Sequence, residues 1–336
     1  MTKLGIIGAG RIARVHAESI SRMAQAAVKT IADPFLTEEA QAWAKQLSVG
    51  SCIKDYKAIL ADPEIDAVLI CSSTDTHAPI SLEAIAAGKH IFCEKPVSQD
   101  LGEIFEVKKA LAASPVKYQV GFNRRFDHNF RAARAAVEAG KIGQPHTVRI
   151  TSRDPAPPPV SYIKSSGGMF MDMTIHDFDM LRYITGSEID EVFVRAGVMV
   201  DPAIGKAGDV DTAVIILTMK DGTIAIIENS RQALYGYDQR IEVFGSLGMV
   251  ATGNDALSTA VISSKEGIAS EKPLYFFLER YMDAFVGEMR AFVEAIKNNT
   301  PVPVGIEDGL QSVLVAMACN LSLKENRAVK MAEVGR

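Results

Sequence analysis

The sequence lacks the features that mark membrane, secreted or nucleic-acid-binding proteins. It has only four cysteines among 336 residues, and none of them stands in a CxxC pair. Buried free thiols in a reducing cytoplasm are therefore expected, and no disulfide framework. No apolar stretch approaches the roughly 20 residues that a membrane helix needs. Positive charge is not in excess, because 36 Lys and Arg face 41 Asp and Glu, so neither nucleic acid nor an anionic membrane is an expected partner.

A secretory signal is also not indicated, although Lys3 is followed by an apolar run. The run is too short and is interrupted by Gly5, Gly8 and Gly10, so it predicts a buried strand. What the chain does have is the composition of a globular protein, 48% hydrophobic and 23% charged. Its length predicts two domains.

Residues 8–13 spell Gly-Ala-Gly-Arg-Ile-Ala, at the end of that apolar run. This is the G-x-G-x-x-A form of the dinucleotide-binding fingerprint. Gly8 would allow the tight turn, Gly10 would let a pyrophosphate approach the backbone, and Ala13 would let the helix pack on the strand. The N–H groups at the helix N-terminus would then bind the phosphates. The cofactor residues predicted in this loop are Gly8, Ala9, Gly10, Arg11 and Ile12.

A second apolar run ends in Asp33, about 20 residues after Ala13. A carboxylate at this distance binds the ribose 2′-hydroxyl of NAD. The 2′-phosphate of NADP would meet its negative charge, and no arginine follows Asp33 directly. The segment therefore predicts NAD as the cofactor.

Strand-like and helix-like segments alternate from here to about residue 120, which predicts a parallel, doubly wound sheet. Ligands on such sheets bind at the carboxyl ends of the strands. Polar residues lie at the ends of the strands predicted at 65–73, 89–96 and 116–126. The further residues expected on this rim are Ser72, Ser73, Thr74, His77, Glu94, Lys95, Asn123 and Arg125. His77 could equally cap a helix, and Lys95 taken alone would be an ordinary loop lysine.

Three motifs together resemble one known family, that of glucose-fructose oxidoreductase, inositol dehydrogenase and rhizopine catabolism proteins. They are the G-x-G-x-x-A loop, a strand ending in Glu94-Lys95-Pro96, and an Asp-x-x-x-His pair at Asp172 and His176. The resemblance covers essentially the whole chain. Four short segments are most similar to those of the inositol 2-dehydrogenases: GFNRRFD, SRDP, SGGMFMDMTIHDFDMLRYITG and YGYDQRIEVFG.

The resemblance implies an NAD-binding Rossmann domain over residues 1–120. Residues 121–336 would form an α+β domain with a large, mostly antiparallel open sheet, which binds substrate and mediates assembly into tetramers through its outer face. The residues agree, because beyond 140 strand-like runs follow one another without intervening helices. Lys220-Asp221-Gly222-Thr223 is a hairpin signal between two of them. Residues 277–299 predict a long amphipathic helix.

Residues 167–180, GGMFMDMTIHDFDM, place ionisable side chains in an apolar segment. In one helix Asp172, His176 and Asp179 would share a face. Three interpretations compete: a structural i,i+4 pair with Asp177 and Asp179 as surface charges, two ligands of a metal ion, or a catalytic pair. No third and fourth metal ligand with matching spacing is visible. The resemblance favours catalysis, with Lys95, Asp172 and His176 as a triad, no metal, and Asp177 as a structural residue.

In the expected mechanism His176 takes the hydroxyl proton as hydride leaves the same carbon for NAD, since histidine titrates near neutral pH. Asp172 orients the imidazole, and Lys95 hydrogen-bonds the reacting oxygen. Whether Lys95 or His176 first takes the proton stays open. The residues expected to bind a polyol are Lys95, Asn123, Arg125, Arg153, Asp154, Asp172, His176, Asp179 and Tyr235, of which Asp179 and Tyr235 follow the family pattern.

The expected function is NAD-dependent oxidation of an inositol, at the 2-position of myo-inositol, by a cytoplasmic homo-oligomer. Scyllo-inositol, chiro-inositol or an aldose sugar are the alternatives within the enzyme class. Outside that class, the chain could be a regulator that binds the dinucleotide without catalysis. Such a regulator should lack the triad, whereas Lys95, Asp172 and His176 are all present.

Overall fold

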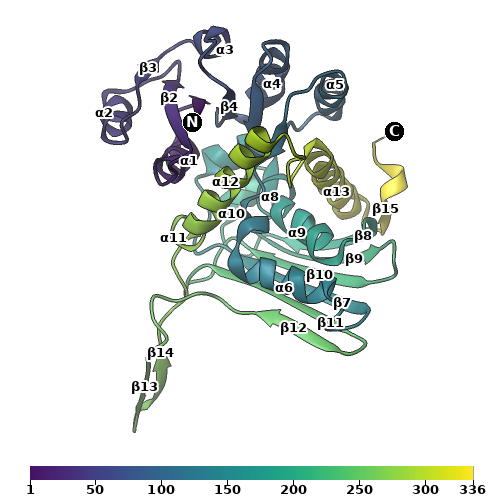
Figure 1. The fold of residues 1–336 in the computed structure, drawn as a ribbon. Coiled ribbons are helices and arrows are strands. Elements are labelled where there is room, and N and C mark those ends of the chain that lie inside the picture. The colour runs from purple at the N-terminus through teal and green to yellow at the C-terminus, as the bar shows by residue number, and fades with distance from the viewer. Residues whose placement is uncertain (336) are drawn as a thin grey trace. The chain divides into compact units, whose positions relative to one another are not determined.

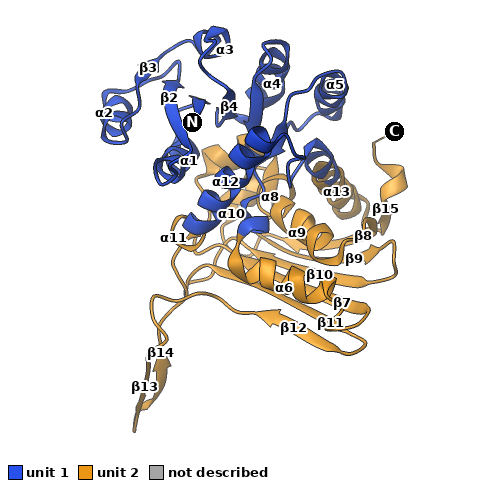
Figure 2. Cartoon of the chain, in the orientation of Figure 1, with its two compact units in different colours: residues 1–126, 282–311 blue, residues 127–281, 312–336 orange. Residues whose placement is uncertain are grey.

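The computed structural model describes residues 1–335 and divides into two compact units (Figures 1 and 2). Unit 1 consists of residues 1–126 and 282–311, and unit 2 of residues 127–281 and the chain from Ser312 onward. Residues 282–311 therefore pack with the N-terminal part of the chain, although they lie far from it in the sequence. The functional division at residue 120, into a cofactor domain and a substrate domain, stays a prediction.

Unit 1 contains a six-stranded sheet in the order β3-β2-β1-β4-β5-β6, with every strand pair parallel. This confirms the predicted Rossmann fold. The strands are β1 (Thr2–Ile7), β2 (Ala26–Ala32), β3 (Ser51–Ile53), β4 (Ala67–Ile70), β5 (His90–Cys93) and β6 (Tyr118–Val120). Strand β3 was not predicted, because three residues on a partly exposed edge are too few to show a pattern.

Most helices of unit 1 connect successive strands of the parallel sheet, whereas α12 (Met282–Asn298) comes from a later part of the chain. The others are α1 (Arg11–Ser21), α2 (Glu38–Gln46), α3 (Lys57–Ala61), α4 (His77–Ala86) and α5 (Leu101–Ala112), with 3₁₀ turns η1 (Thr74–Thr76) and η2 (Asn123–Phe126). Of the strand predicted over residues 116–126, only β6 forms, and η2 takes the place of its last four residues. The long helix predicted over 277–299 is instead a short α11 (Phe277–Arg280) followed by α12.

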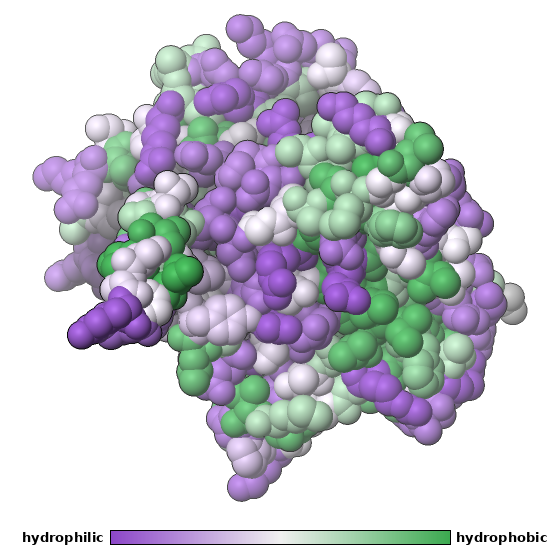
Figure 3. Space-filling model, turned by 90° about the horizontal axis from the view of Figure 1, so that it is seen from below, coloured by the Kyte–Doolittle hydropathy of each residue, from purple (hydrophilic) through white to green (hydrophobic). Residues whose placement is uncertain are grey.

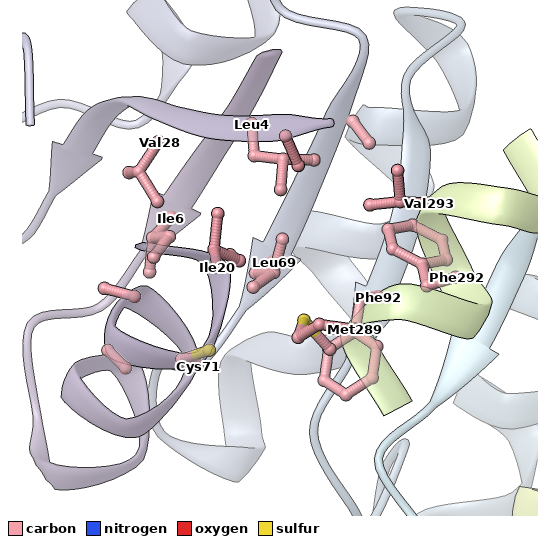
Figure 4. Close-up of a cluster of buried hydrophobic side chains, with 14 of the residues drawn as sticks. Leu4, Ile6, Ile20, Val28, Leu69, Cys71, Phe92, Met289, Phe292 and Val293 are labelled. Carbon is pink, nitrogen blue, oxygen red and sulfur yellow. The ribbon is translucent and has the colours of Figure 1, made fainter. Parts of the chain in front are cut away.

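The core of unit 1 joins the sheet to α12 (Figure 4). Leu69 on β4 and Phe92 on β5 are fully buried, and so are Met289 and Phe292 on α12. The rings of Phe92 and Phe292 meet edge to face with centroids 5.9 Å apart. An amphipathic helix must bury its apolar stripe, and α12 buries its stripe against the parallel sheet of unit 1.

Unit 2 contains a seven-stranded sheet in the order β12-β11-β7-β10-β9-β8-β15. Only the β10–β7 pair is parallel, which confirms the predicted mostly antiparallel sheet. The strands are β7 (Pro145–Arg153), β8 (Ile189–Gly197), β9 (Thr212–Met219), β10 (Ile224–Ser230), β11 (Asp238–Gly245), β12 (Gly248–Thr252) and β15 (Val329–Lys330). The predicted hairpin turn joins β9 to β10, with Gly222 at a φ of +91°.

The two faces of this sheet differ. Helices lie on one face, among them α6 (His128–Glu138) and α9 (Ile175–Thr185) (Figure 1). The remaining helices and turns of unit 2 are α7 (Val160–Ser166), α8 (Gly168–Asp172), α10 (Pro202–Lys206), α11, η3 (Met331–Glu333) and most of α13 (Ile306–Glu325). A separate hairpin of β13 (Val261–Ser264) and β14 (Gly267–Ser270) is exposed along its whole length. The opposite face of the sheet carries an apolar patch at the surface (Figure 3).

The packing of α12 gives a testable expectation for stability. Replacement Phe292→Ala should lower the free energy of unfolding of unit 1 by about 3–5 kcal/mol, because it removes a fully buried ring and leaves a cavity. Trp43, the only tryptophan, lies in unit 1, so its fluorescence in a urea titration reports the change. The matched control is Phe105→Ala on α5, where the ring is 43% exposed and the loss should be small. Equal losses in both variants would contradict the assignment of α12 to this core.

Candidate functional site

The loop between β1 and α1 is shaped by two glycines with different constraints. Gly8 has a φ of +104°, and a Cβ on it would lie 2.6 Å from the carbonyl oxygen of Cys71 and 2.9 Å from the nitrogen of Ser72. No side chain fits there, so the close approach of this loop to the end of β4 requires glycine. A Cβ on Gly10 would meet no atom within 4 Å, so the backbone there faces open space. Gly10 is the N-cap of α1 and offers no capping side chain, which leaves the first N–H groups of the helix for a ligand.

Asp33 follows β2 directly and is held at this loop by two backbone hydrogen bonds. Its Oδ2 accepts from the N–H of Ala9 at 2.7 Å, and its Oδ1 accepts from the N–H of Phe35 at 2.8 Å. The structure thus brings the predicted ribose-binding carboxylate to the predicted pyrophosphate loop. Open space at Gly10, free helix N–H groups and this carboxylate together fit a dinucleotide.

The ends of β4 and β5 bring further predicted residues to the same edge of the sheet, since Ile70 pairs with Cys93. Ser72 and Thr74 follow β4, and the Ser72 hydroxyl hydrogen-bonds that of Thr76 at 2.6 Å. Glu94 follows β5, is 8% exposed, and lies 2.6 Å from the Nε2 of His16 on α1. Lys95 is half-buried next to it. Among the other predicted residues, Ser73 and Arg11 are exposed, Ile12 is half-buried, Asn123 is buried, and Arg125 forms an ion pair with Asp308 at 2.8 Å.

His77 ties the two strand ends together and does not cap α4 with its ring. Its Nδ1 lies 2.8 Å from the carbonyl oxygen of Pro96, and its Nε2 lies 3.1 Å from that of Ser72. Carbonyl oxygens only accept, so both ring nitrogens must donate, and only the protonated ring does this. Burial alone would lower the pKa of His77, but the neighbouring Cys93 sulfur and these two carbonyl oxygens outweigh it and raise the pKa to about 9.

In unit 2 the segment 167–180 does not form the single helix that the spacing predicted. It forms α8, which ends at Asp172, and α9, which begins at Ile175. The N–H groups of Met173 and Thr174 both bond the carbonyl oxygen of Met169, which closes α8 before α9 starts. The prediction of one shared helix face for Asp172, His176 and Asp179 was therefore wrong. Asp172 and His176 are half-buried, whereas Asp179 is 1% exposed.

Asp172 is held by two donors from other elements. The Tyr162 hydroxyl of α7 donates to its Oδ1 at 2.9 Å, and the Nη1 of Arg231 donates to its Oδ2 at 3.1 Å. The same Nη1 lies 3.6 Å from the Oδ2 of Asp154. Two predicted residues, Asp154 and Asp172, thus share one buried arginine.

A second polar cluster contains Arg153 and Tyr235. The Nη1 of Arg153 donates to the Tyr235 hydroxyl at 2.8 Å, and this hydroxyl donates to Asp238 at 2.6 Å. Arg153 also pairs with Glu228. Burial raises the pKa of Tyr235, and its bond to Asp238 adds to this. The predicted residues Arg153 and Tyr235 therefore lie together, joined by an aspartate that the sequence reading had not selected.

Asp177 is fully buried. The interpretation that made it a surface charge was therefore wrong. Its Oδ2 accepts from the side-chain amide of Asn229 at 2.8 Å, and the oxygen of that amide accepts from Thr174 at 2.6 Å. This network explains why the segment needs so many polar groups in apolar surroundings, since buried polar groups must be paired.

The residues that the sequence reading missed are Arg231, Tyr162, Asn229 and Asp238. Arg231 did carry a signal, because a charge directly after an apolar strand is the pattern that selected Asp33 and Lys95. Over residues 1–335, no group of three or more His, Cys, Asp or Glu side chains is placed to hold a metal ion. Nor is any helix in that range both long and apolar enough to cross a membrane.

Comparison with known families decides the wider assignment. Residues 2–122 match the model of an oxidoreductase family with an NAD-binding Rossmann fold, and residues 130–251 match the GFO/IDH/MocA C-terminal domain. The chain belongs to the GFO/IDH/MocA family. Membership confirms the resemblance seen in the motifs, the oxidoreductase class and NAD as the cofactor.

Relatives in this family match over nearly the full length. The chain is 47% identical to the myo-inositol 2-dehydrogenase of Thermotoga maritima over 99% of both chains, and 44% identical to the inositol 2-dehydrogenase of Rhizobium meliloti over 98% of this chain and 99% of the relative. Among solved structures, scyllo-inositol dehydrogenase from Lactobacillus casei with bound NAD(H) and scyllo-inositol is 34% identical over 99% of both chains, with a TM-score of 0.92.

The environment of His77 predicts a pH-dependent stability. Because its folded-state pKa of about 9 exceeds the ordinary 6.5, its contribution is complete below pH 6.5 and disappears as the pH rises through about 9. The advantage of the wild type over His77→Gln in the free energy of unfolding should therefore fall by up to about 3 kcal/mol across this range. Urea titrations followed by Trp43 fluorescence measure it.

His90→Gln is the matched control in the same unit. Burial, with Lys117 nearby, lowers the pKa of His90. Its difference from the wild type should change below pH 6.5 and stay constant above it. A constant difference for His77→Gln from pH 6.5 to 9 would show that its ring is not protonated in the folded state.

Proposed function

We propose that this protein oxidises an inositol with NAD, and that the substrate is myo-inositol, oxidised at its 2-position. The observation that carries this is the full-length likeness to the Thermotoga maritima and Rhizobium meliloti enzymes named for that activity. Scyllo-inositol is the second candidate, because a structural neighbour binds it, but at a lower identity of 34%. Chiro-inositol, an aldose sugar and a non-catalytic regulator remain the weaker alternatives.

The residues of unit 1 would hold the dinucleotide. Gly8, Ala9, Gly10, Arg11 and Ile12 would surround the pyrophosphate, and Asp33 would bind the adenosine ribose. Ser72, Ser73, Thr74, Glu94 and Lys95 would line the rest of the rim, and His77 would keep the two strand ends in place. Bound NAD would supply the hydride acceptor.

The residues of unit 2 would handle the proton. His176 would accept the proton of the substrate hydroxyl as a general base, because imidazole titrates close to neutral pH. Asp172 would stabilise the imidazolium that results, as the aspartate of a catalytic triad does. The observation that supports this role is the fixed carboxylate of Asp172, which receives donors on both oxygens. Lys95 completes the proposed triad as a donor to the reacting oxygen.

The hydroxyl groups of a polyol would be recognised by paired donors and acceptors. The proposed residues are Lys95, Asn123, Arg125, Arg153, Asp154, Asp172, His176, Asp179 and Tyr235. The Arg153–Tyr235–Asp238 cluster supports this best, because it offers a cation, a hydroxyl and a carboxylate at one place. A site built in this way discriminates strongly against analogues that lack a hydroxyl.

The proposed oxidation is tested by NADH absorbance with purified protein, NAD or NADP, and myo-, scyllo- and chiro-inositol, glucose and galactose. Myo-inositol should give the highest kcat/KM, with NAD preferred. His176→Ala should lose at least about 100-fold in kcat, while NAD binding by unit 1 is kept. The control His128→Ala removes a histidine whose side chain is 66% exposed on α6, and should keep full activity. Turnover of none of the five substrates by the wild type would contradict the proposal.

We further propose a homotetramer that assembles through the open face of the unit 2 sheet. Ile216 on β9 and Ile226 on β10 are directly opposite each other and 45% and 36% exposed. Val214, Ile224, Phe244 and Met249 extend the same apolar patch, with 41–53% of each exposed (Figure 3). A patch of this kind on one face of a sheet is typical of an interface. A cytoplasmic location is proposed from the four cysteines, which are all free in the described residues.

Light scattering coupled to gel filtration tests the assembly. The wild type should have the mass of four chains, and Ile216→Glu with Ile226→Glu should reduce it, because four or more carboxylates would be buried without partners. Phe105→Glu, an equally exposed apolar position on α5 of unit 1, should leave the mass unchanged. A double variant that keeps the wild-type mass would rule out this face as the interface.

A further inference from the structure

Arg231 is a buried cation in a place where burial is costly. It follows β10 directly, is 2% exposed, and its backbone N–H bonds the carbonyl oxygen of Asp211 at 2.8 Å. Its Nη1 faces Asp172 at 3.1 Å and Asp154 at 3.6 Å. A guanidinium taken out of water is tolerated only when carboxylates compensate its charge. These carboxylates come from the end of α8 and from the residue after β7, so one cation joins three separate segments.

The charges around Arg231 are predominantly negative. Burial by itself would lower the pKa of Arg231, but Asp172 and Asp154, with Asp209 further away, outweigh burial and raise it. Arg231 is therefore a permanent cation at all pH values that an enzyme meets. A fixed positive charge thus stands at hydrogen-bond distance from the carboxylate of Asp172, and such a charge favours the ionised form of a carboxylic acid.

The carboxylate of Asp172 is also fixed in orientation. Its Oδ2 is bound by Arg231 and its Oδ1 by the Tyr162 hydroxyl, so rotation about the terminal bond would break both hydrogen bonds. The chain between Asp172 and His176 contains the break between α8 and α9. Regular helix geometry therefore does not fix how the side chains of Asp172 and His176 are oriented relative to each other. The orientation of the Asp172 carboxylate is fixed by its two donors instead.

We propose that Arg231 is a positioning residue for the oxidation: it acts through Asp172, whose carboxylate it holds in a fixed orientation. The inference rests on the proposed function, because it gives Arg231 a task only if Asp172 serves His176. In this role Asp172 never takes the proton of the alcohol, which stays on the imidazole. Arg231 itself touches neither substrate nor cofactor in the proposed mechanism.

The titratable groups with a described interaction at Arg231 or Asp172 come from three further segments: Asp154 follows β7, Asp209 follows α10, and Tyr162 lies on α7. The proposed base, His176, lies on α9. Removal of the cation leaves an excess of negative charge there, which favours protonation of the imidazole. The acidic limb of the pH profile, where the base is lost by protonation, should therefore move to higher pH when the charge of Arg231 is removed.

The experiment compares Arg231→Gln, which removes the charge, with Arg231→Lys, which keeps the charge but loses the planar fork. Arg280→Lys is the control, because Arg280 is an equally buried arginine of unit 2 that pairs with Asp127 and Asp255. Melting temperature, NAD binding and the pH profile of kcat/KM with myo-inositol are measured for each. We expect all three variants to have a lower melting temperature, since each removes or distorts a buried ion pair.

The two Arg231 variants should lose about 10- to 100-fold in kcat with NAD binding unchanged. Arg231→Gln should shift the acidic limb up by about one pH unit, and Arg231→Lys should not shift it. Arg280→Lys should keep kcat and the pH profile. If Arg231→Gln does not fold, Arg231→Lys decides through its kcat.

Failure of the inference is distinct from failure of the proposed function. If the wild type is active and the folded Arg231 variants keep its kcat and pH profile, the positioning role is overturned and the dehydrogenase function stands. Equal kinetic losses in Arg280→Lys also overturn it, since any buried ion pair would then have the same effect. A wild type that oxidises no inositol overturns the proposed function and the positioning role together.

Discussion

The approach of the β1–α1 loop to the end of β4 is the constraint on which the nucleotide half of this protein depends. A single methyl group on Gly8 would overlap the backbone of Cys71. Because β1 is central and pairs with both β2 and β4, this contact places Asp33 and Ser72 on either side of one short loop. The arrangement therefore follows from strand pairing and one residue without a side chain, and needs few specific side-chain contacts.

Unit 2 is organised by a different kind of interaction. Its polar residues are joined by side-chain bonds between segments far apart in the sequence, such as Asp172 with Arg231 and Arg153 with Tyr235. A carboxylate between two donors is worth more in low-dielectric surroundings than at the surface, but it is also costly if one donor is missing. The chemistry proposed for Asp172 thus depends on residues that never need to meet the substrate.

What could be predicted from the sequence was local in nature. The G-x-G-x-x-A loop, the position of Asp33 and the class of both sheets follow from short spacing and from runs of apolar residues, and the structure confirms the fold that they imply. The break between α8 and α9 could not be seen, because the helical periodicity continues through Met173 and Thr174 while the backbone does not. The contacts of Arg231 and Tyr162 with Asp172 could not be seen, because side-chain bonds across 59 and 10 residues leave no periodic trace. Which residues form the site stays a prediction for the experiments.

Residues 282–311 belong to unit 1 although they follow most of unit 2 in the sequence, and this limits where the chain can be cut into fragments that fold. A fragment that ends at residue 126 would contain all six strands of the parallel sheet, yet it would lack α12. Phe92 would then lose the ring of Phe292, and a part of the core would become water-exposed surface. Each unit is thus made of two separate segments of the chain. Exchange of the second unit between relatives would therefore need three crossover points, near residue 126, near residue 281 and inside α13.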